Sequence, residues 1–206
     1  RKIWVTQAVN RFDAELAKNL AINGSEKARA GALRALYYDA SNTSGLFPIL
    51  EKLVSDSSLQ VRLWAVSVLA QIDNPRSVEV ALRALDGVNP DIYLDFAVWS
   101  ICREHKQGWL AKIEQNPKKN PFPTLEHLLF ALFSVEQSDH KGRFRHPVYG
   151  EITKVRDSAG GGAIGVGLIF ESLKKEKFKQ AKDREKAIQW IGMVGNSAQL
   201  DDLFEF

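Results

Sequence analysis

The sequence predicts an all-α protein, a right-handed α-α superhelix of about five to six helix pairs. Two observations predict this class. An apolar pattern with helical spacing returns every 32 to 33 residues, and no segment shows the period-two alternation of a β-strand. The 206 residues are 45% hydrophobic and 26% charged, which is typical of a globular protein whose core needs neither disulfides nor metals.

The clearest copy of the pattern lies at residues 61–72. One helical face there carries Val61, Trp64, Ala65, Val68, Leu69 and Ile72. The same face is expected at 28–36, and again at 93–101, 125–133 and 187–195. A weak, glycine-diluted copy at 155–163 lies midway between the last two. A fixed period of this length indicates stacked supersecondary units.

A second apolar segment follows each of the clear early copies, at 46–54, 78–85 and 109–113. Ser25 and either Ser57 or Ser58 are expected to cap helices, and the Asn-Pro pairs at 74–75 and 89–90 mark breaks. Each copy therefore predicts two antiparallel helices. Neither member of a pair can bury its apolar face alone, so neighbouring pairs are expected to stack.

The segment Asp56-x5-Arg62, with its following apolar positions, resembles the first helix of a HEAT repeat in its short bacterial form. In such repeats an Asp and an Arg form a ladder between adjacent units. Asp56, Arg62 and Arg29 match that pattern, while Leu94 in the next copy departs from it.

A more specific resemblance comes from the stretches 80–86, 91–99 and 108–110. They are similar to the HEAT segment of large exported bacterial proteins, in which a sugar-dehydrogenase-like β-propeller precedes the repeats and a c-type cytochrome domain follows. The resemblance covers about residues 25–135 and implies an extracytoplasmic location, periplasmic or secreted.

We expect one HEAT-like solenoid domain over residues 1–206, a fragment of a larger protein, with an irregular or degraded repeat at 137–167. Within that region, Gly160-x-Gly162-x-x-Gly165 has the form of the dinucleotide-binding fingerprint. The fingerprint requires a preceding strand and a βαβ unit, and neither is predicted here. We therefore expect a flexible or close-packed glycine segment and no nucleotide site.

Catalytic and metal-binding motifs are absent from the sequence. A single cysteine, Cys102, excludes an internal disulfide, a haem-attachment CxxCH motif and a multi-cysteine zinc site, and it is expected to be buried and inert. His140 and His146 lack a chelating spacing. The longest apolar run, 163–170, is far below the ~18 residues of a membrane span. We expect no catalytic residue, no cofactor, no metal and no membrane span.

Partner binding is assigned to one tryptophan and four basic residues: Trp109, Lys118, Lys119, Arg143 and Arg145. Trp64, Trp99 and Trp190 are expected at or beside core positions, which leaves Trp109 as the tryptophan expected at a surface. A further basic run covers 174–186. The net charge of +3 is too small to indicate a dedicated nucleic-acid binder.

These features predict a non-enzymatic protein-interaction or spacer scaffold. Its partners would be proteins or, as the resemblance implies, neighbouring domains of the parent chain, with a dehydrogenase domain held near a cytochrome domain. The alternative is a HEAT-like DNA-binding protein or alkylpurine DNA glycosylase, a resemblance that implies a basic cleft lined with Trp and an acid. A self-associating scaffold is a third possibility.

Overall fold

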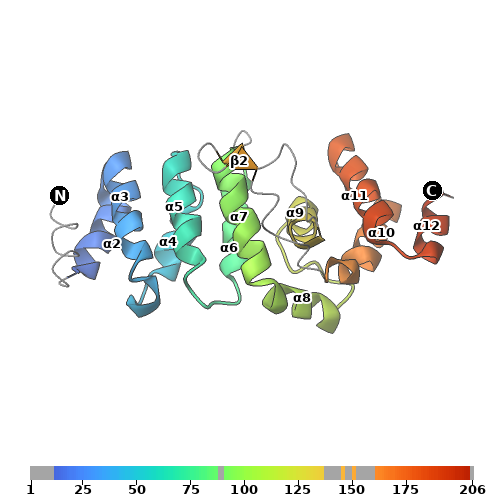
Figure 1. The fold of residues 1–206 in the computed structure, drawn as a ribbon, viewed down its shortest axis with the longest axis horizontal. Coiled ribbons are helices and arrows are strands. Elements are labelled where there is room, and N and C mark those ends of the chain that lie inside the picture. Colours follow the sequence, from blue (N-terminus) through green and yellow to red (C-terminus); the bar gives the residue numbers. More distant parts are fainter. Residues whose placement is uncertain (1–11, 88–90, 137–144, 147–149, 152–160, 205–206) are drawn as a thin grey trace. The chain divides into compact units, whose positions relative to one another are not determined.

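The computed structural model describes residues 12–87, 91–136, 145–146, 150–151 and 161–204. The described chain divides into two compact units, residues 1–101 and 102–206, and the division falls within helix α7 (Ile92–Glu104). Both units are built from successive packed helices (Figure 1). The predicted all-α class of HEAT-like α-α solenoid is confirmed.

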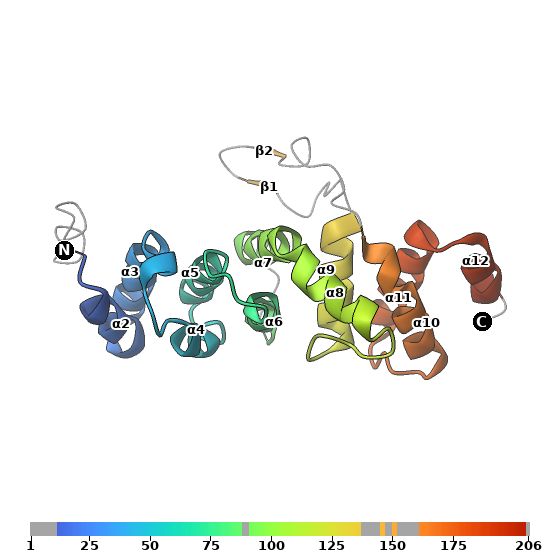
Figure 2. The ribbon, with the colours of Figure 1, turned by 90° about the horizontal axis from the view of Figure 1, so that it is seen from below.

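Unit 1 arranges its helices in two rows. Its elements before α7 are α2 (Ala14–Asn23), α3 (Glu26–Tyr37), η1 (Ala40–Asn42), α4 (Phe47–Leu53), α5 (Leu59–Leu69), α6 (Ser77–Leu82) and η2 (Arg83–Leu85). Helix α3 packs against both α2 and α5, and α5 packs against α4 and α6. Helices α3 and α5 form one row, and α2, α4 and α6 form the other (Figure 2). Helices are present at the predicted 28–36, 46–54, 61–72 and 78–85. The predicted pairing of 61–72 with 78–85 is confirmed by the packing of α5 on α6.

Local sequence explains where these helices begin. Asp13 caps α2 by accepting a hydrogen bond of 2.9 Å from the Leu16 N–H, and Ser58 caps α5 by accepting one from the Val61 N–H. Ser25 occupies the predicted cap position of α3, but its side chain makes no capping bond. Of the two serines considered for α5, Ser58 is therefore the cap.

Unit 2 contains α8 (Lys106–Gln115), α9 (Leu125–Glu136), β1 (Arg145–His146), β2 (Gly150–Glu151), η4 (Gly162–Gly165), α10 (Val166–Lys174), α11 (Ala181–Val194) and α12 (Ser197–Phe204). Helix α11 packs on α9, α10 and α12. The copies predicted at 125–133 and 187–195 are thus helices. Most of the weak copy at 155–163 lies outside the described residues.

One described feature of the region 137–167 differs from the prediction. No strand was expected, yet β1 and β2 form an antiparallel ribbon in which Arg145 pairs with Glu151 and His146 with Gly150. The glycine segment from 161 onward is regular: η4 leads directly into α10. The expectation of a single domain over 1–206 remains a prediction, since units of a solenoid contact only their neighbours along the chain.

An arginine ladder joins the helix pairs of unit 1. Arg29 on α3 makes two hydrogen bonds to the carboxylate of Asp56, with Nε–Oδ2 and Nη2–Oδ1 distances of 2.9 and 2.8 Å. Asp56 lies 27 residues later, before α5, so this pair links two successive pairs of helices. The ladder inferred from the Asp56 and Arg29 pattern is confirmed.

Arg62 continues the ladder through main-chain oxygens. Its side chain, only 9% exposed, donates to the carbonyls of Asp56, Ala84 and Asp86. The position that would correspond to Asp56 in the following unit, residue 89, lies outside the described residues. Through the Ala84 and Asp86 carbonyls, Arg62 ties α5 to the end of the following helix.

Replacing Arg62 with Ala is expected to lower the free energy of unfolding by about 2–4 kcal/mol, because it removes several hydrogen bonds from a buried cation and leaves carbonyls unpaired. Arg83→Ala is the matched control, since the Arg83 side chain is one-third exposed and its hydrogen bond to the Glu51 carbonyl is long, at 3.4 Å. Urea unfolding measures both. An equal loss of unfolding free energy in the two variants would show that Arg62 contributes no more to stability than Arg83 does.

The Arg29–Asp56 pair also predicts a dependence of stability on pH. Burial alone would raise the pKa of Asp56, but hydrogen bonds from Arg29 and from the Ser58 N–H, with the charges of Arg29 and Arg62, lower it below its ordinary value. A carboxyl whose folded pKa is lowered stabilises the fold above its unfolded pKa, about 3.9, and this stabilisation is lost as the pH falls through the folded pKa.

Asp56→Asn should therefore reduce the free energy of unfolding by about 1–3 kcal/mol at pH 7. The difference in unfolding free energy between this variant and the unchanged protein should shrink once the pH falls below about 4. Urea unfolding at several pH values measures this, with the exposed Asp73→Asn as the control. A difference that stays constant from pH 7 to pH 3 would show that the pair contributes no charge-dependent stability.

Candidate functional site

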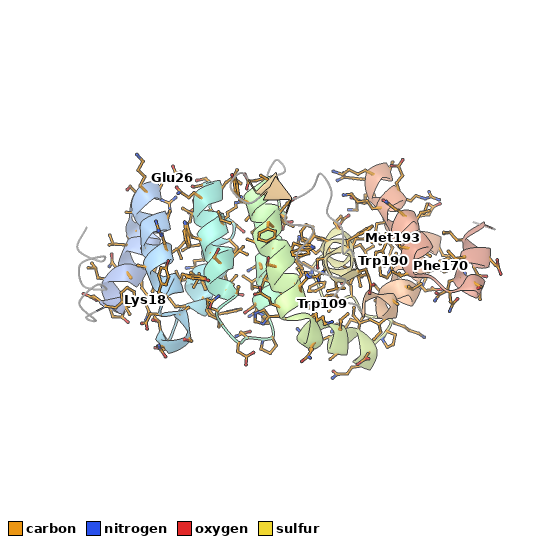
Figure 3. All side chains as sticks on the ribbon, in the orientation of Figure 1. Lys18, Glu26, Trp109, Phe170, Trp190 and Met193 are labelled. Atoms are coloured by element: carbon orange, nitrogen blue, oxygen red, sulfur yellow. The ribbon has the colours of Figure 1, made fainter. Side chains whose placement is uncertain are left out.

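Trp109 is a core residue, which corrects its predicted position at a surface. Its side chain is 2% exposed, and its indole Nε1 donates a 2.9 Å hydrogen bond to the Cys102 carbonyl. The ring of Phe122 lies 5.6 Å away between centroids. Figure 3 marks Trp109 on α8. The short segment 109–113 has too few residues for its periodicity to show which face of α8 is buried, so the sequence did not reveal this contact.

The four basic candidates have different outcomes. Lys118 and Lys119 are exposed in the connection between α8 and α9, and Lys118 lines a pocket together with Lys175 and Lys177. Arg143 lies outside the described residues, as does His140. Arg145 is in β1, where its main chain pairs with Glu151. The structure thus brings one predicted residue, Lys118, together with the later lysine run.

The glycine segment serves packing. A Cβ atom added to Gly165 would lie 2.9 Å from both Cδ atoms of Leu132, a fully buried side chain of α9. A Cβ atom added to Gly162 would lie 2.6 Å from Glu136 Cγ, and the Glu136 Oε1 accepts a hydrogen bond from the Gly162 N–H. The close-packed alternative is confirmed for Gly162 and Gly165, while Gly160 lies outside the described residues.

Gly165→Ala is expected to destabilise unit 2 by about 1–3 kcal/mol, because its methyl group would overlap the buried Leu132 side chain. Gly167→Ala is the matched control two positions later. Nothing lies within 4 Å of a Cβ added there, so this change should stabilise the protein by about 0.4–1 kcal/mol. Thermal unfolding followed by circular dichroism measures both, and the same shift in both variants would contradict the close packing.

Trp64 is half-buried on the surface of α5, whereas Trp99 and Trp190 lie in the core as predicted. Trp64 belongs to a cluster that we call the aromatic surface, formed by Arg34, Tyr37, Tyr38 and Trp64. Tyr37 meets Trp64 edge to face at 6.3 Å and 70°, and Tyr38 at 5.3 Å and 87°. The Arg34 guanidinium carbon lies 5.7 Å from the centre of the Trp64 ring.

The aromatic surface has the composition of a protein-binding site. Tyr38 is 63% exposed, which is large for an aromatic side chain, and Arg34 is exposed beside it. Trp, Tyr and Arg are the residue types that most often dominate the energy of protein–protein interfaces. Stacking on Trp64 also holds the long Arg34 side chain in place, which reduces the entropy lost on binding.

Sequence reasoning missed this surface because Trp64 shares its helical spacing with the buried Ala65 and Val68. An apolar stripe has a width, and the sequence does not show where its edge falls. The adjacent Tyr37-Tyr38 pair was an available signal, since successive residues of a helix lie on different parts of its circumference.

The described residues show no catalytic constellation. They contain no group of three or more His, Cys, Asp or Glu side chains placed to hold a metal ion. Cys102 is buried as predicted, and that burial raises the pKa of its thiol to about 12, against a smaller opposing effect of a hydrogen bond with Ser134. Within the same residues, no helix has the length and apolar character needed to cross a bilayer.

Comparison with known proteins identifies one similarity. Residues 14–101 match the family model described as HEAT repeats. Searches of curated proteins and of solved structures found no match. The matched segment covers the helix pairs that carry the Arg29–Asp56 ladder and the aromatic surface. Residues 14–101 are therefore similar to HEAT repeats, a family typical of protein-interaction scaffolds.

Proposed function

We propose that this chain is a non-enzymatic protein-interaction module whose binding site is the aromatic surface of α3 and α5. The observation that carries the proposal is the cluster of Tyr37, Tyr38 and Trp64 with Arg34 stacked on it, on a segment similar to HEAT repeats. A cluster of these residue types left outside the core favours a protein partner.

The geometry gives less support to the DNA glycosylase alternative. That activity would need tryptophans in an accessible basic cleft, and Trp99, Trp109 and Trp190 are all buried. The aromatic surface contains a single cation, Arg34, whereas duplex binding requires several phosphate contacts. These observations favour a protein partner over nucleic acid.

The finer part of the proposal concerns the identity of the partner. The resemblance to exported bacterial proteins suggests that the partners are neighbouring domains of one parent chain, outside the cytoplasm, with the repeats holding a dehydrogenase domain near a cytochrome domain. In that arrangement the aromatic surface would contact one of those two domains.

Site-specific photocrosslinking tests the proposal in the full-length parent protein. Benzoylphenylalanine placed at Tyr38 should crosslink to one polypeptide segment, identified by mass spectrometry. The same group at Asn19, an exposed position on α2, is the control and should not produce that crosslink. Crosslinks of equal yield from both positions would contradict a binding site at the aromatic surface.

The segment identified in this way allows a quantitative prediction. Trp64→Ala should weaken its binding by about 30-fold or more, the effect of losing an interface residue worth about 2 kcal/mol. Because Trp64 is half-buried, the variant is expected to remain folded, which circular dichroism checks. Leu59→Ala, at an exposed apolar position on the same helix, is the control. An affinity unchanged by Trp64→Ala would overturn the proposal.

A further inference from the structure

Unit 2 contains a pocket of about 400 Å³ at the C-terminal end of α10. Two separate parts of the chain form it. Its walls include Pro117, Lys118, Leu168, Glu171, Lys175 and Lys177. The volume falls within the range of about 300–1,000 Å³ that is usual for small-molecule sites.

The pocket has an excess of positive charge. Three of its lining residues are lysines and one is a carboxylate, so its walls carry a net charge of +2. Lys175 is paired with Glu171 at an Nζ–Oε2 distance of 3.1 Å. Lys118 and Lys177 form no ion pair with any residue that the structure describes.

Within the pocket walls, a single carboxylate offsets part of this excess. A hydrogen bond and the charge of Lys175, with the charges of Lys174 and Lys118, lower the pKa of Glu171, so this carboxylate is ionised and neutralises one lysine. Lys174 is directed elsewhere, since its Nζ lies 4.5 Å from the centre of the Phe170 ring, marked in Figure 3. The charges of Lys118 and Lys177 thus remain available to a ligand.

The backbone around Glu176 holds two of the lysines in place. The Glu176 N–H donates to the Leu173 carbonyl at 2.9 Å and the Lys177 N–H to the Ser172 carbonyl at 3.0 Å, which closes α10 with a Schellman motif. Glu176 has φ of +50°, the one positive value at a non-glycine position in the described chain. Glycine is the usual residue at this position, and such local strain is often found at functional sites.

We propose that this pocket binds a small phosphate-bearing anion. Two unpaired ammonium groups from different elements, Lys118 and Lys177, would converge on its oxygens, while Leu168 and Pro117 would contact an apolar part of the ligand. Lysine acts as a point charge and suits tetrahedral phosphate oxygens. The site is independent of the aromatic surface in unit 1.

Isothermal titration of the full chain with inorganic pyrophosphate tests the proposal. Saturable binding of one pyrophosphate per chain is expected, weakened about tenfold by Lys118→Gln and by Lys177→Gln, since each loses one charge-assisted contact. Lys27→Gln, an exposed lysine on α3, is the charge-matched control and should leave the affinity unchanged. Both pocket lysines are on the surface or at a turn, so circular dichroism should show the fold intact.

Three outcomes would overturn the proposal. The first is an affinity that falls equally in Lys27→Gln, which would indicate general charge attraction. The second is citrate binding as tight as pyrophosphate binding, which would indicate a site for any polyanion. The third is the absence of measurable pyrophosphate binding at low salt. This holds also if duplex DNA binds instead and Lys118→Gln abolishes the DNA binding, because the lysines would then serve nucleic acid and not a small anion.

Discussion

The structure depends on one constraint: a pair of amphipathic helices has more apolar surface than the pair can bury by itself. In unit 1, α3 meets this constraint by packing against both α2 and α5, and its buried face is rich in small residues such as Ala30, Ala32 and Ala35. Small side chains allow helix axes to approach closely, and the larger Leu33 and Leu36 fill the space between them. Stacking of successive pairs follows from this arrangement.

Polar groups fix how the stacked pairs align. Apolar packing has little directional preference, whereas the two hydrogen bonds from Arg29 to Asp56 require one geometry. Arg62 provides the same kind of link with main-chain carbonyls as acceptors. This shows that the arginine position of the ladder can be retained where a different acceptor is used. The ladder lies beside the core, so it orients the helices without breaking the apolar contact between them.

The two proposed sites are formed by side chains that the helices place outside the core. On α3 and α5, aromatic side chains at the edge of the apolar stripe remain accessible and are held by contacts with one another and with Arg34. In unit 2, the end of α10 and the α8–α9 connection bring lysines together around a pocket. A scaffold of packed helices can thus carry separate binding surfaces, because outward-facing positions do not contribute to the core and are able to vary.

The sequence by itself determined the all-α class and the positions of helices α3 to α9 and α11, because helical periodicity and a repeat of fixed length are local properties that can be read along the chain. The Arg29–Asp56 ladder followed from the resemblance of the segment to HEAT repeats. Only the tertiary structure decided that Trp109 is buried, that Trp64 lies at the edge of the core, and that Gly165 packs on Leu132. It also decided that Lys118 meets Lys175 and Lys177. Each of these facts depends on which distant element covers a given face, and no local pattern encodes that.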